Sequence, residues 1–237
     1  LHVQRGMIFD RNGKELAVSV PVVSVYADPK ALHKSLVSKV IKQARKSGED
    51  HLSLTENTAE LDKRTALYYK NDLRWRELAD VLRIDPKKIN SRLLNDPSRR
   101  FVYLKRQVTP AVANYIGDLR LPGIHLLDES KRYYPAGEVT AHVIGFTNID
   151  GKGIEGIEKL YENALTGEEG RRTIRKDAQG REVEVLDERE RVEPESIELS
   201  IDQRIQAIAY KAVKSAVLTY KATSGSAMVV DVKTGEV

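Results

Sequence analysis

Few residues in this 237-residue chain have the types and spacing that catalysis or metal binding requires. Glu155 and Glu158 lie three positions apart, so a helix would place both carboxylates on one face. Such a pair could act as an acid and a base only in a substrate cleft, and the surrounding sequence indicates none. The five histidines have no close metal-ligand spacing, and there is no cysteine to act as a thiolate. These residues form no convincing catalytic centre or metal site.

The segment that contains the two glutamates is rich in residues with special backbone preferences. Five glycines supply positions where positive φ or close backbone approach costs little, and Pro135 fixes its own φ. The glycines are Gly137, Gly145, Gly151, Gly153 and Gly156. Such density predicts a tightly folded joint between modules rather than a loose linker. His142, within this joint, is interpreted as a hydrogen-bonding residue and not as a base.

The first part of the chain predicts strands followed by helices. Asn12-Gly13 separates two apolar runs and predicts a hairpin, because both residues tolerate φ > 0. Residues 22–27 read as a third strand, and Asp28-Pro29 as the start of a helix with Leu32, Leu36, Val40 and Ile41 on one face. Residues 49–65 are polar and weakly patterned, which predicts a loop. Trp75, in the next helical stripe, is predicted to be core rather than a binding anchor.

The second part predicts a strand–helix–strand unit, a hairpin and one long helix. The unit runs from a strand at 101–106 to a strand at 124–127, with a helix that begins at Thr109. Further on we expect a helix over 154–165, a charged hairpin of 171–176 with 181–186, and a charged linker. The chain then predicts a strand at 196–201, a helix from Asp202 to about Tyr220, and an apolar strand at 226–232.

The charge and hydropathy of the chain restrict its partners. The net charge is +4, but 39 basic residues are interleaved with 35 acidic ones, which is typical of a mixed solvated surface. A basic cluster of residues 99, 100, 105 and 106 surrounds Phe101 and Tyr103, and one such cluster is too small to predict a nucleic-acid surface. No apolar run approaches the roughly 20 residues that span a bilayer. The first residue is Leu1, so we interpret the sequence as a fragment whose membrane anchor is missing.

Three stretches resemble the motifs of class B penicillin-binding proteins. The first is Arg5-Gly6-Met7-Ile8-Phe9-Asp10-Arg11-Asn12-Gly13. The second is Arg132-Tyr133-Tyr134-Pro135 with Gly137, His142 and Gly145, and the third is Gly153-Ile154-Glu155-Gly156-Ile157-Glu158. Residues 199–209 resemble the lead-in to the transpeptidase domain of that family. The intervening sequence is most similar to the division-specific members from Gram-negative bacteria.

The resemblance implies the non-catalytic N-terminal module of a septal peptidoglycan D,D-transpeptidase, on the periplasmic side of the inner membrane. The expected class is α+β: a β-rich pedestal over 1–200, an inserted helical head over about 30–131, and a β-hairpin arm. Residues 201–237 would begin the transpeptidase domain. Expected partners are that domain and division proteins: an FtsW-type glycosyltransferase, FtsN, and FtsQ-, FtsL- and FtsB-type proteins. No nucleic acid and no cofactor is expected.

The catalytic residues that the resemblance implies are missing from this chain. Serine acyl transfer in the family needs a serine three positions before a lysine, then a Ser-x-Asn loop and a Lys-Thr-Gly strand. No serine here has lysine three positions later, and there is no Ser-x-Asn. Lys233-Thr234-Gly235 follows an apolar run directly, so we interpret it as a turn. The chain itself is therefore predicted to be inert.

Four further hypotheses remain open on the sequence. Asp10, Arg11, Arg132 and Glu155 could form a charge network between domains. The apolar run at 226–232 would expose a strand edge, which predicts a homodimer that exchanges a segment between copies. Two alternative functions are the pedestal of an elongation-type relative and an unrelated module that binds an anionic polymer.

Overall fold

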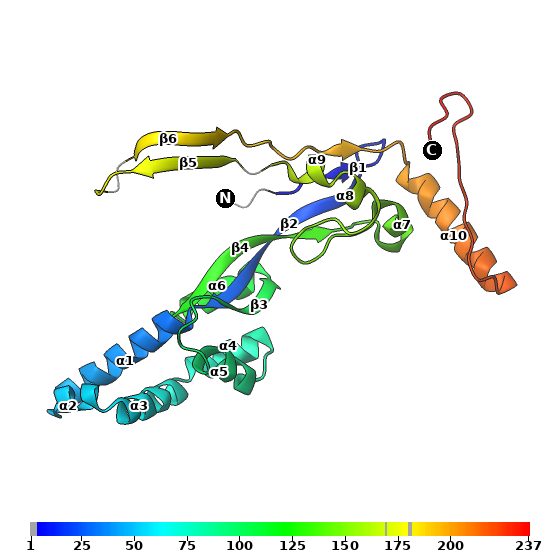
Figure 1. Ribbon diagram of the computed structural model, residues 1–237. Coiled ribbons are helices and arrows are strands. Elements are labelled where there is room, and N and C mark those ends of the chain that lie inside the picture. The colour runs from blue at the N-terminus through cyan, green and yellow to red at the C-terminus, as the bar shows by residue number, and fades with distance from the viewer. Residues whose placement is uncertain (1–3, 169, 180–181) are drawn as a thin grey trace. The chain divides into compact units, whose positions relative to one another are not determined.

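The computed structural model describes residues 4–168, 170–179 and 182–237, which fold into two compact units (Figure 1). The first unit consists of Leu1–Val20 and Ser130–Val237, and the second of Pro21–Glu129. The chain passes between them within two strands, β2 (Glu15–Ala27) and β4 (Ile124–Tyr133), which pair with each other. Helices and strands occur in both units, which confirms the α+β class.

In the second unit, helix α1 (Pro29–Lys46) begins where the sequence predicts. The Asp28 carboxylate accepts a hydrogen bond from the Ala31 N–H at 2.8 Å, and Pro29 occupies the first turn. Leu32, Leu36 and Val40 are buried as predicted. The helix gives way to a turn at Gly48, whose φ of +76° suits glycine.

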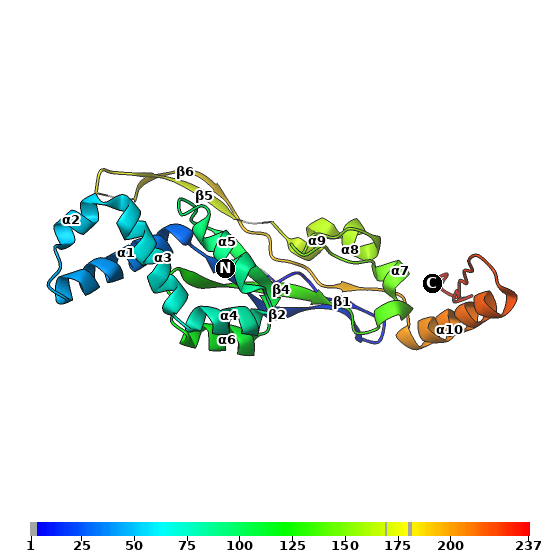
Figure 2. The same cartoon turned by 90° about the horizontal axis from the view of Figure 1, so that it is seen from below.

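The loop predicted over residues 49–65 is wrong. Helices α2 (His51–Glu56) and α3 (Thr58–Asn71) occupy this stretch and pack against α1 (Figure 2). Local capping explains both starts: Asp50 accepts hydrogen bonds from the N–H groups of two residues, and Asn57 from one. Only a few apolar residues, Leu54 among them, face the core, so the helical period is weak in the sequence.

Trp75 lies in the first of the remaining helices of this unit, and its burial confirms that it is a core residue. Its exposed fraction is 5%, and its ring lies 4.7 Å from the ring of Tyr69. Strand β3 pairs antiparallel with β2 and continues the apolar core. The elements are α4 (Arg74–Leu82), α5 (Pro86–Leu94), β3 (Val102–Val108) and α6 (Pro110–Asp118).

In the first unit, a short strand links the two ends of the chain. Strand β1 (Ile8–Phe9) pairs antiparallel with β2 and parallel with β7 (Ile197–Glu198). The predicted hairpin turn is present, but only Gly13 has positive φ. The two strands expected over 15–20 and 22–27 form one strand, because Pro21 is accommodated without ending it.

Short helices and an arm complete the first unit. The helix predicted over 154–165 divides at Tyr161, whose backbone leaves the helical region (φ −106°, ψ 29°). The predicted hairpin arm is formed by two antiparallel strands, although residues 180 and 181 of its turn lie outside the described residues. The elements are η1 (Gly137–Val139), α7 (Ala141–Ile144), α8 (Gly156–Leu160), α9 (Glu162–Thr166), β5 (Arg171–Lys176) and β6 (Glu182–Arg189).

The C-terminal segment follows helix α10 (Gln203–Tyr220). The strand predicted over 226–232 is wrong: these residues are irregular, because no described segment forms a ladder with them. Lys233-Thr234-Gly235 lies in a turn, as predicted, in which the Gly235 N–H donates to the Asp231 carbonyl at 2.8 Å. Among the described residues, no helix has the length and apolarity needed to cross a membrane.

Gly123 is the tightest glycine of the second unit, and its replacement tests the packing of α1. Its φ is +70°, and an added Cβ would lie 2.8 Å from both the Asp28 carbonyl oxygen and the Leu32 Cβ. We expect Gly123→Ala to lower the free energy of unfolding by about 2–4 kcal/mol, through backbone strain and overpacking. Urea denaturation followed by the fluorescence of Trp75, the single tryptophan, measures this change.

Gly48→Ala is the matched control, because Gly48 has φ +76° but open space around its Cβ position. Gly48→Ala should lower the free energy of unfolding by only about 1 kcal/mol. Equal losses in the two variants would contradict the close approach of α1 to Gly123.

Candidate functional site

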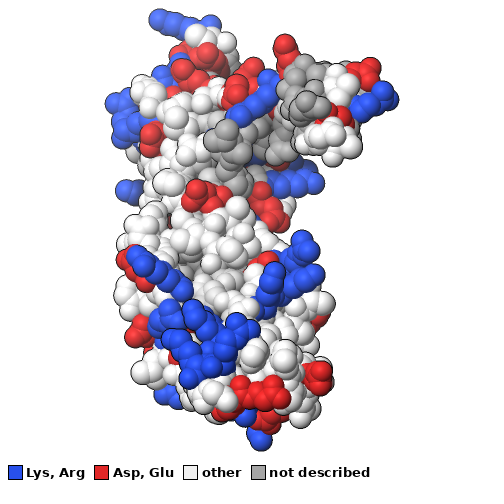
Figure 3. Space-filling model, turned by 90° about the vertical axis from the view of Figure 1, so that its left-hand side faces the viewer, with Lys and Arg blue, Asp and Glu red and all other residues white. Residues whose placement is uncertain are grey.

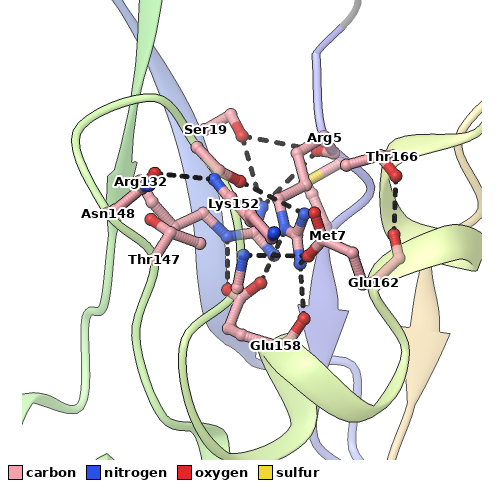
Figure 4. Close-up of polar contacts among 12 residues, drawn as sticks. Arg5, Met7, Ser19, Arg132, Thr147, Asn148, Lys152, Glu158, Glu162 and Thr166 are labelled. Atoms are coloured by element: carbon pink, nitrogen blue, oxygen red, sulfur yellow. Dashed lines mark hydrogen bonds and ion pairs between the residues drawn. The ribbon is translucent and has the colours of Figure 1, made fainter.

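A buried carboxylate in the first unit joins two arginines from distant parts of the chain (Figure 4). Arg5 precedes β1, Arg132 lies near the end of β4, and Glu158 lies in α8. The Arg5 Nε donates to Glu158 Oε2, and the Arg132 Nε to Oε1, each at 2.6 Å. Each carboxylate oxygen therefore binds a different guanidinium group.

The remaining contacts of Arg5 involve both main chain and side chains. Its Nη2 donates to the Glu158 carbonyl oxygen at 2.6 Å and to Glu162 Oε2 at 2.8 Å. Its Nη1 donates to the Gly151 carbonyl oxygen at 3.2 Å. With Arg132, the group comprises two guanidinium groups and two carboxylates, so its formal charges cancel.

Burial determines the energetic character of this network. The exposed fractions of the side chains of Arg5, Arg132 and Glu158 are 6%, 3% and 0%. Charges removed from water in this way are stable only when each is paired and hydrogen-bonded. Removing one partner leaves an uncompensated buried charge, so the three residues function as a unit that fixes the geometry of the segments carrying them.

Glycines allow the backbone around this unit to pack closely. A Cβ on Gly145 would lie 1.9 Å from the Glu155 carbonyl oxygen, and one on Gly153 would lie 2.2 Å from the Glu158 carbonyl oxygen. Gly145 also has φ +75°. This part of the chain is therefore packed as tightly as its glycine content predicts.

A second buried carboxylate, that of Asp10, holds the start of α10. Its Oδ1 accepts hydrogen bonds from the N–H groups of Asn12 and Lys14, each at 2.8 Å. Its Oδ2 accepts one from the Gln203 N–H at 3.1 Å. The first turn of α10 is thereby joined to the hairpin turn, where an anion also complements the helix dipole.

The pKa of Asp10 reflects two opposing effects. Burial would by itself raise it, but the hydrogen bonds from the N–H groups of Lys14, Gln203 and Asn12 outweigh burial. The pKa is therefore lowered from its ordinary value, and the carboxylate is ionised at neutral pH. Asp202, the N-cap of α10, also has a lowered pKa, chiefly because the Arg204 side chain and N–H donate to it.

The structure separates the charge network predicted for Asp10, Arg11, Arg132 and Glu155. Arg132 pairs with Glu158, whereas Glu155 is exposed and forms no ion pair in the described part of the chain. Arg11 forms an exposed pair with Glu236 at 2.8 Å. The network prediction is therefore wrong in its membership, because the helical turn of α8 directs residue 158, and not residue 155, inward.

The other residues of the three motifs occupy varied environments. Gly6 is buried, and a Cβ there would lie 1.9 Å from the Glu195 carbonyl oxygen. His142 is exposed and makes no side-chain hydrogen bond among the described residues, so the hydrogen-bonding role expected for it is wrong. The exposed motif residues are Met7, Arg11, Asn12, Gly13, Tyr133, Pro135, Gly137, His142, Ile154, Glu155 and Gly156.

Sequence reasoning missed two partners, Glu162 and Gln203. Glu162 lies four positions after Glu158, and this spacing could have indicated that both carboxylates lie beside Arg5. The contact of Gln203 with Asp10 uses a backbone N–H, so no side-chain type could indicate it.

The carboxylate of Glu158 is fully engaged in ion pairs. Both oxygens of Glu158 are bound by guanidinium groups, so they are unavailable for proton transfer. Within residues 4–168, 170–179 and 182–237, no cluster of His, Cys, Asp and Glu could hold a metal ion. The chemistry of the site is that of a structural clamp.

Comparison with known proteins identifies the family of this chain. The model of the penicillin-binding protein dimerisation domain matches residues 1–199. The chain belongs to this family. The resemblance of its three motifs to class B penicillin-binding proteins is thereby confirmed.

Curated relatives of this family member are peptidoglycan enzymes. The peptidoglycan D,D-transpeptidase FtsI of Escherichia coli K12 is 45% identical over 98% of this chain and 34% of its own length. FtsI of Buchnera aphidicola from Schizaphis graminum is 37% identical, over 99% of this chain and 36% of its own length. The probable peptidoglycan D,D-transpeptidase PenA of Neisseria gonorrhoeae is 35% identical over 100% of this chain and 35% of its own length. The chain thus spans about a third of the length of these relatives.

A solved structure shares the fold of this family member. It is a complex between the penicillin-binding protein PBP2 and MreC from Helicobacter pylori, with a TM-score of 0.56 and 21% identity. The match covers 91% of this chain and 38% of the other. At this identity the likeness concerns the fold alone.

Replacing Glu158 with glutamine tests the clamp at nearly constant volume. We expect Glu158→Gln to lower the free energy of unfolding by about 3–5 kcal/mol, because two buried guanidinium groups lose their shared counter-charge. Chemical denaturation followed by circular dichroism measures the change. Glu138→Gln is the control: Glu138 pairs with Lys214 at the surface, and its replacement should lower the free energy of unfolding far less than Glu158→Gln does. Similar losses would show that burial confers no special role on Glu158.

Asp10 predicts a pH-dependent contribution to stability. Because its folded-state pKa is lowered, the contribution is fully present above the unfolded-state value of about 4 and is lost as pH falls through the folded pKa. Wild type should exceed Asp10→Asn by about 2 kcal/mol at neutral pH, and the difference should shrink below about pH 4. Urea titrations at several pH values measure it.

The control for this titration is Asp118→Asn, which alters an exposed aspartate with no side-chain hydrogen bond among the described residues. Its free energy of unfolding should stay within about 0.5 kcal/mol of wild type at every pH. A difference between wild type and Asp10→Asn that does not change with pH would contradict the ionised, hydrogen-bonded carboxylate.

Proposed function

We propose that this chain is the non-catalytic pedestal of a septal peptidoglycan D,D-transpeptidase and that it positions the catalytic domain. The observation that carries the proposal is the bond between Asp10 and the Gln203 N–H, which fixes the first turn of α10 to the family domain. Residues 201–237 then begin the transpeptidase domain. The match of the family model to residues 1–199, which ends just before this helix, supports that boundary.

Further contacts of α10 support the same role. Gln206 Nε2 donates to the Val139 carbonyl oxygen at 3.0 Å, and Lys214 pairs with Glu138 at 2.9 Å. These polar contacts orient the helix, yet none of its residues is buried, and Ile208 is 70% exposed. We assign this exposed apolar side to contact with the remainder of the transpeptidase domain.

An adjoining hollow fits this assignment. It has a volume of about 600 Å³ and lies between α10 and residues 227–231, with Leu199, Ile205 and Val229 among its apolar lining. In the complete protein, the catalytic domain would fill it. The serine that attacks the D-Ala-D-Ala stem would lie in that domain, and the pedestal would hold it at a fixed position.

The division-specific assignment follows from the relatives, two of which are named FtsI at 45% and 37% identity. The proposed location is therefore the periplasmic side of the inner membrane at the septum. The proposed partners are the FtsW-type glycosyltransferase, FtsN, and FtsQ-, FtsL- and FtsB-type proteins.

A chimera tests the pedestal function. The equivalent region of E. coli FtsI is replaced by this chain in cells depleted of their own FtsI. We expect normal division, because the relative is 45% identical over the region. The same chimera with Asp10→Asn should give filaments while it still binds fluorescent penicillin, since the catalytic domain folds but is misplaced.

Other outcomes of the chimera contradict the proposal. Filaments from the unaltered chimera, with penicillin binding intact, would exclude a division pedestal. Rescue of cells that lack the elongation enzyme, without rescue of division, would favour the elongation-type alternative. Penicillin labelling of the 237-residue chain alone would show that it is catalytic.

The family description also supports self-association. For the 237-residue chain without the catalytic domain, we propose a homodimer in which a segment is exchanged between copies, with 226–232 as the segment because its apolar residues are exposed. Light scattering should show a mass that rises across the micromolar range. A constant monomer mass would contradict the dimer.

A further inference from the structure

Helix α1 carries an unusual concentration of positive charge. The second unit contains 20 Lys and Arg against 14 Asp and Glu, whereas the remainder of the chain contains 19 against 21. Helix α1 has six basic residues and no acidic one, so it alone accounts for the +6 excess of its unit. Five of the six are exposed. We name these five the basic row: Lys30, Lys34, Lys42, Arg45 and Lys46.

The basic row lies on the side of α1 opposite the core. Leu32, Leu36 and Val40 face inward, and the row follows the four-residue ridge on the outer side. From Lys30 to Lys46 the ridge extends roughly 24 Å at the usual helical rise. Figure 3, which shows the side drawn at the left of Figure 1, contains a cluster of Lys and Arg side chains besides smaller basic and acidic groups.

The members of the row lack acidic partners. None of the five forms an ion pair in the described part of the chain, whereas arginines of the neighbouring α3 and of the segment before β3 do, as Arg64 does with Glu49. Arg45 and Lys46 in the last turn complement the helix dipole, which is a structural reason for those two. It gives no reason for Lys30, which lies at the positive end.

The surroundings of the row distinguish between classes of partner. Protein interfaces depend on aromatic or apolar anchors and are poor in lysine. Because no large apolar side chain of α1 is exposed, the row does not fit a protein partner. A bilayer-bound helix also inserts an apolar face, and the apolar face of α1 is buried in the core. A linear row of cations without an anchor fits an extended polyanion.

We propose that the basic row binds a linear polymer that bears carboxylates along its length, and that this polymer is peptidoglycan. The choice of polymer rests on the proposed function, because the peptide stems of peptidoglycan carry free carboxylates along an extended glycan. Lys42, Arg45 and Lys46 line a shallow hollow of about 490 Å³ together with Ile41, which is half-buried, and Ser38, which offers a hydroxyl beside the cations. The pedestal would thus hold a nascent strand as well as the enzyme.

Co-sedimentation with isolated peptidoglycan tests this proposal on the 237-residue chain. Lys30, Lys34, Lys42 and Lys46 are each replaced by glutamine, which preserves helix propensity. The affinity of wild type should fall as the salt concentration rises. The dissociation constant of the variant should be about tenfold higher than that of wild type, because four exposed contacts are lost. Circular dichroism melting confirms that the variant is folded.

The matched control removes the same charge from the same unit. Lys63, Lys70, Lys87 and Lys88 are exposed on α3 and α5 and form no ion pair among the described residues. Their replacement by glutamine should leave the dissociation constant within about twofold of wild type. Equal losses in the two variants would overturn the proposal, because net charge and not the row would then govern binding.

Two further ligands separate the remaining outcomes. Polyglutamate should bind through the same row, and a chain that binds polyglutamate but not peptidoglycan would overturn the choice of polymer. Row-dependent binding to vesicles of anionic lipid, without binding to peptidoglycan, would assign the row to a membrane surface and overturn the proposal. Failure of either kind leaves the division of the chimera unaffected, so it does not bear on the pedestal function.

Discussion

The first unit depends on one buried carboxylate held between two guanidinium groups. Glu158 receives Arg5 from the start of the chain and Arg132 from the end of β4, so three segments meet at a single charge. A buried carboxylate is stable only when it is paired and hydrogen-bonded, and both oxygens of Glu158 accept from a guanidinium group. If one segment moves, a buried charge on another loses its partner. The network therefore fixes the positions of the three segments more than it adds to the free energy of unfolding.

The two units achieve their order by different means. The second has a large apolar core of sixteen buried hydrophobic residues, among them Trp75 and Leu78. Among its described residues, the corresponding cluster of the first unit has five. Because so small a core fixes little by itself, polar contacts at Glu158 and Asp10 define the arrangement there, and close glycine packing makes room for them. Such an arrangement is consistent with the positioning role proposed for this chain.

The errors of sequence reasoning have a common physical cause. Helices α2 and α3 were missed because their caps, Asp50 and Asn57, are isolated polar residues in a polar stretch, and burial against α1 supplies the rest. The strand expected over 226–232 is apolar, but strand formation requires a ladder partner that composition does not reveal. In both cases the decisive interaction is between elements.

The sequence by itself determined the α+β class, the hairpin arm, the family motifs and the burial of Trp75, because these depend on local periodicity, turn residues and residue type. It also placed Arg5, Arg132 and Glu158 within motifs. Only the tertiary structure decided that Glu158 and not Glu155 turns inward, and that Asp10 caps a helix nearly two hundred positions away. Such pairings join residues 153 and 193 positions apart, and the chain brings them together only when its packed elements exclude every other arrangement.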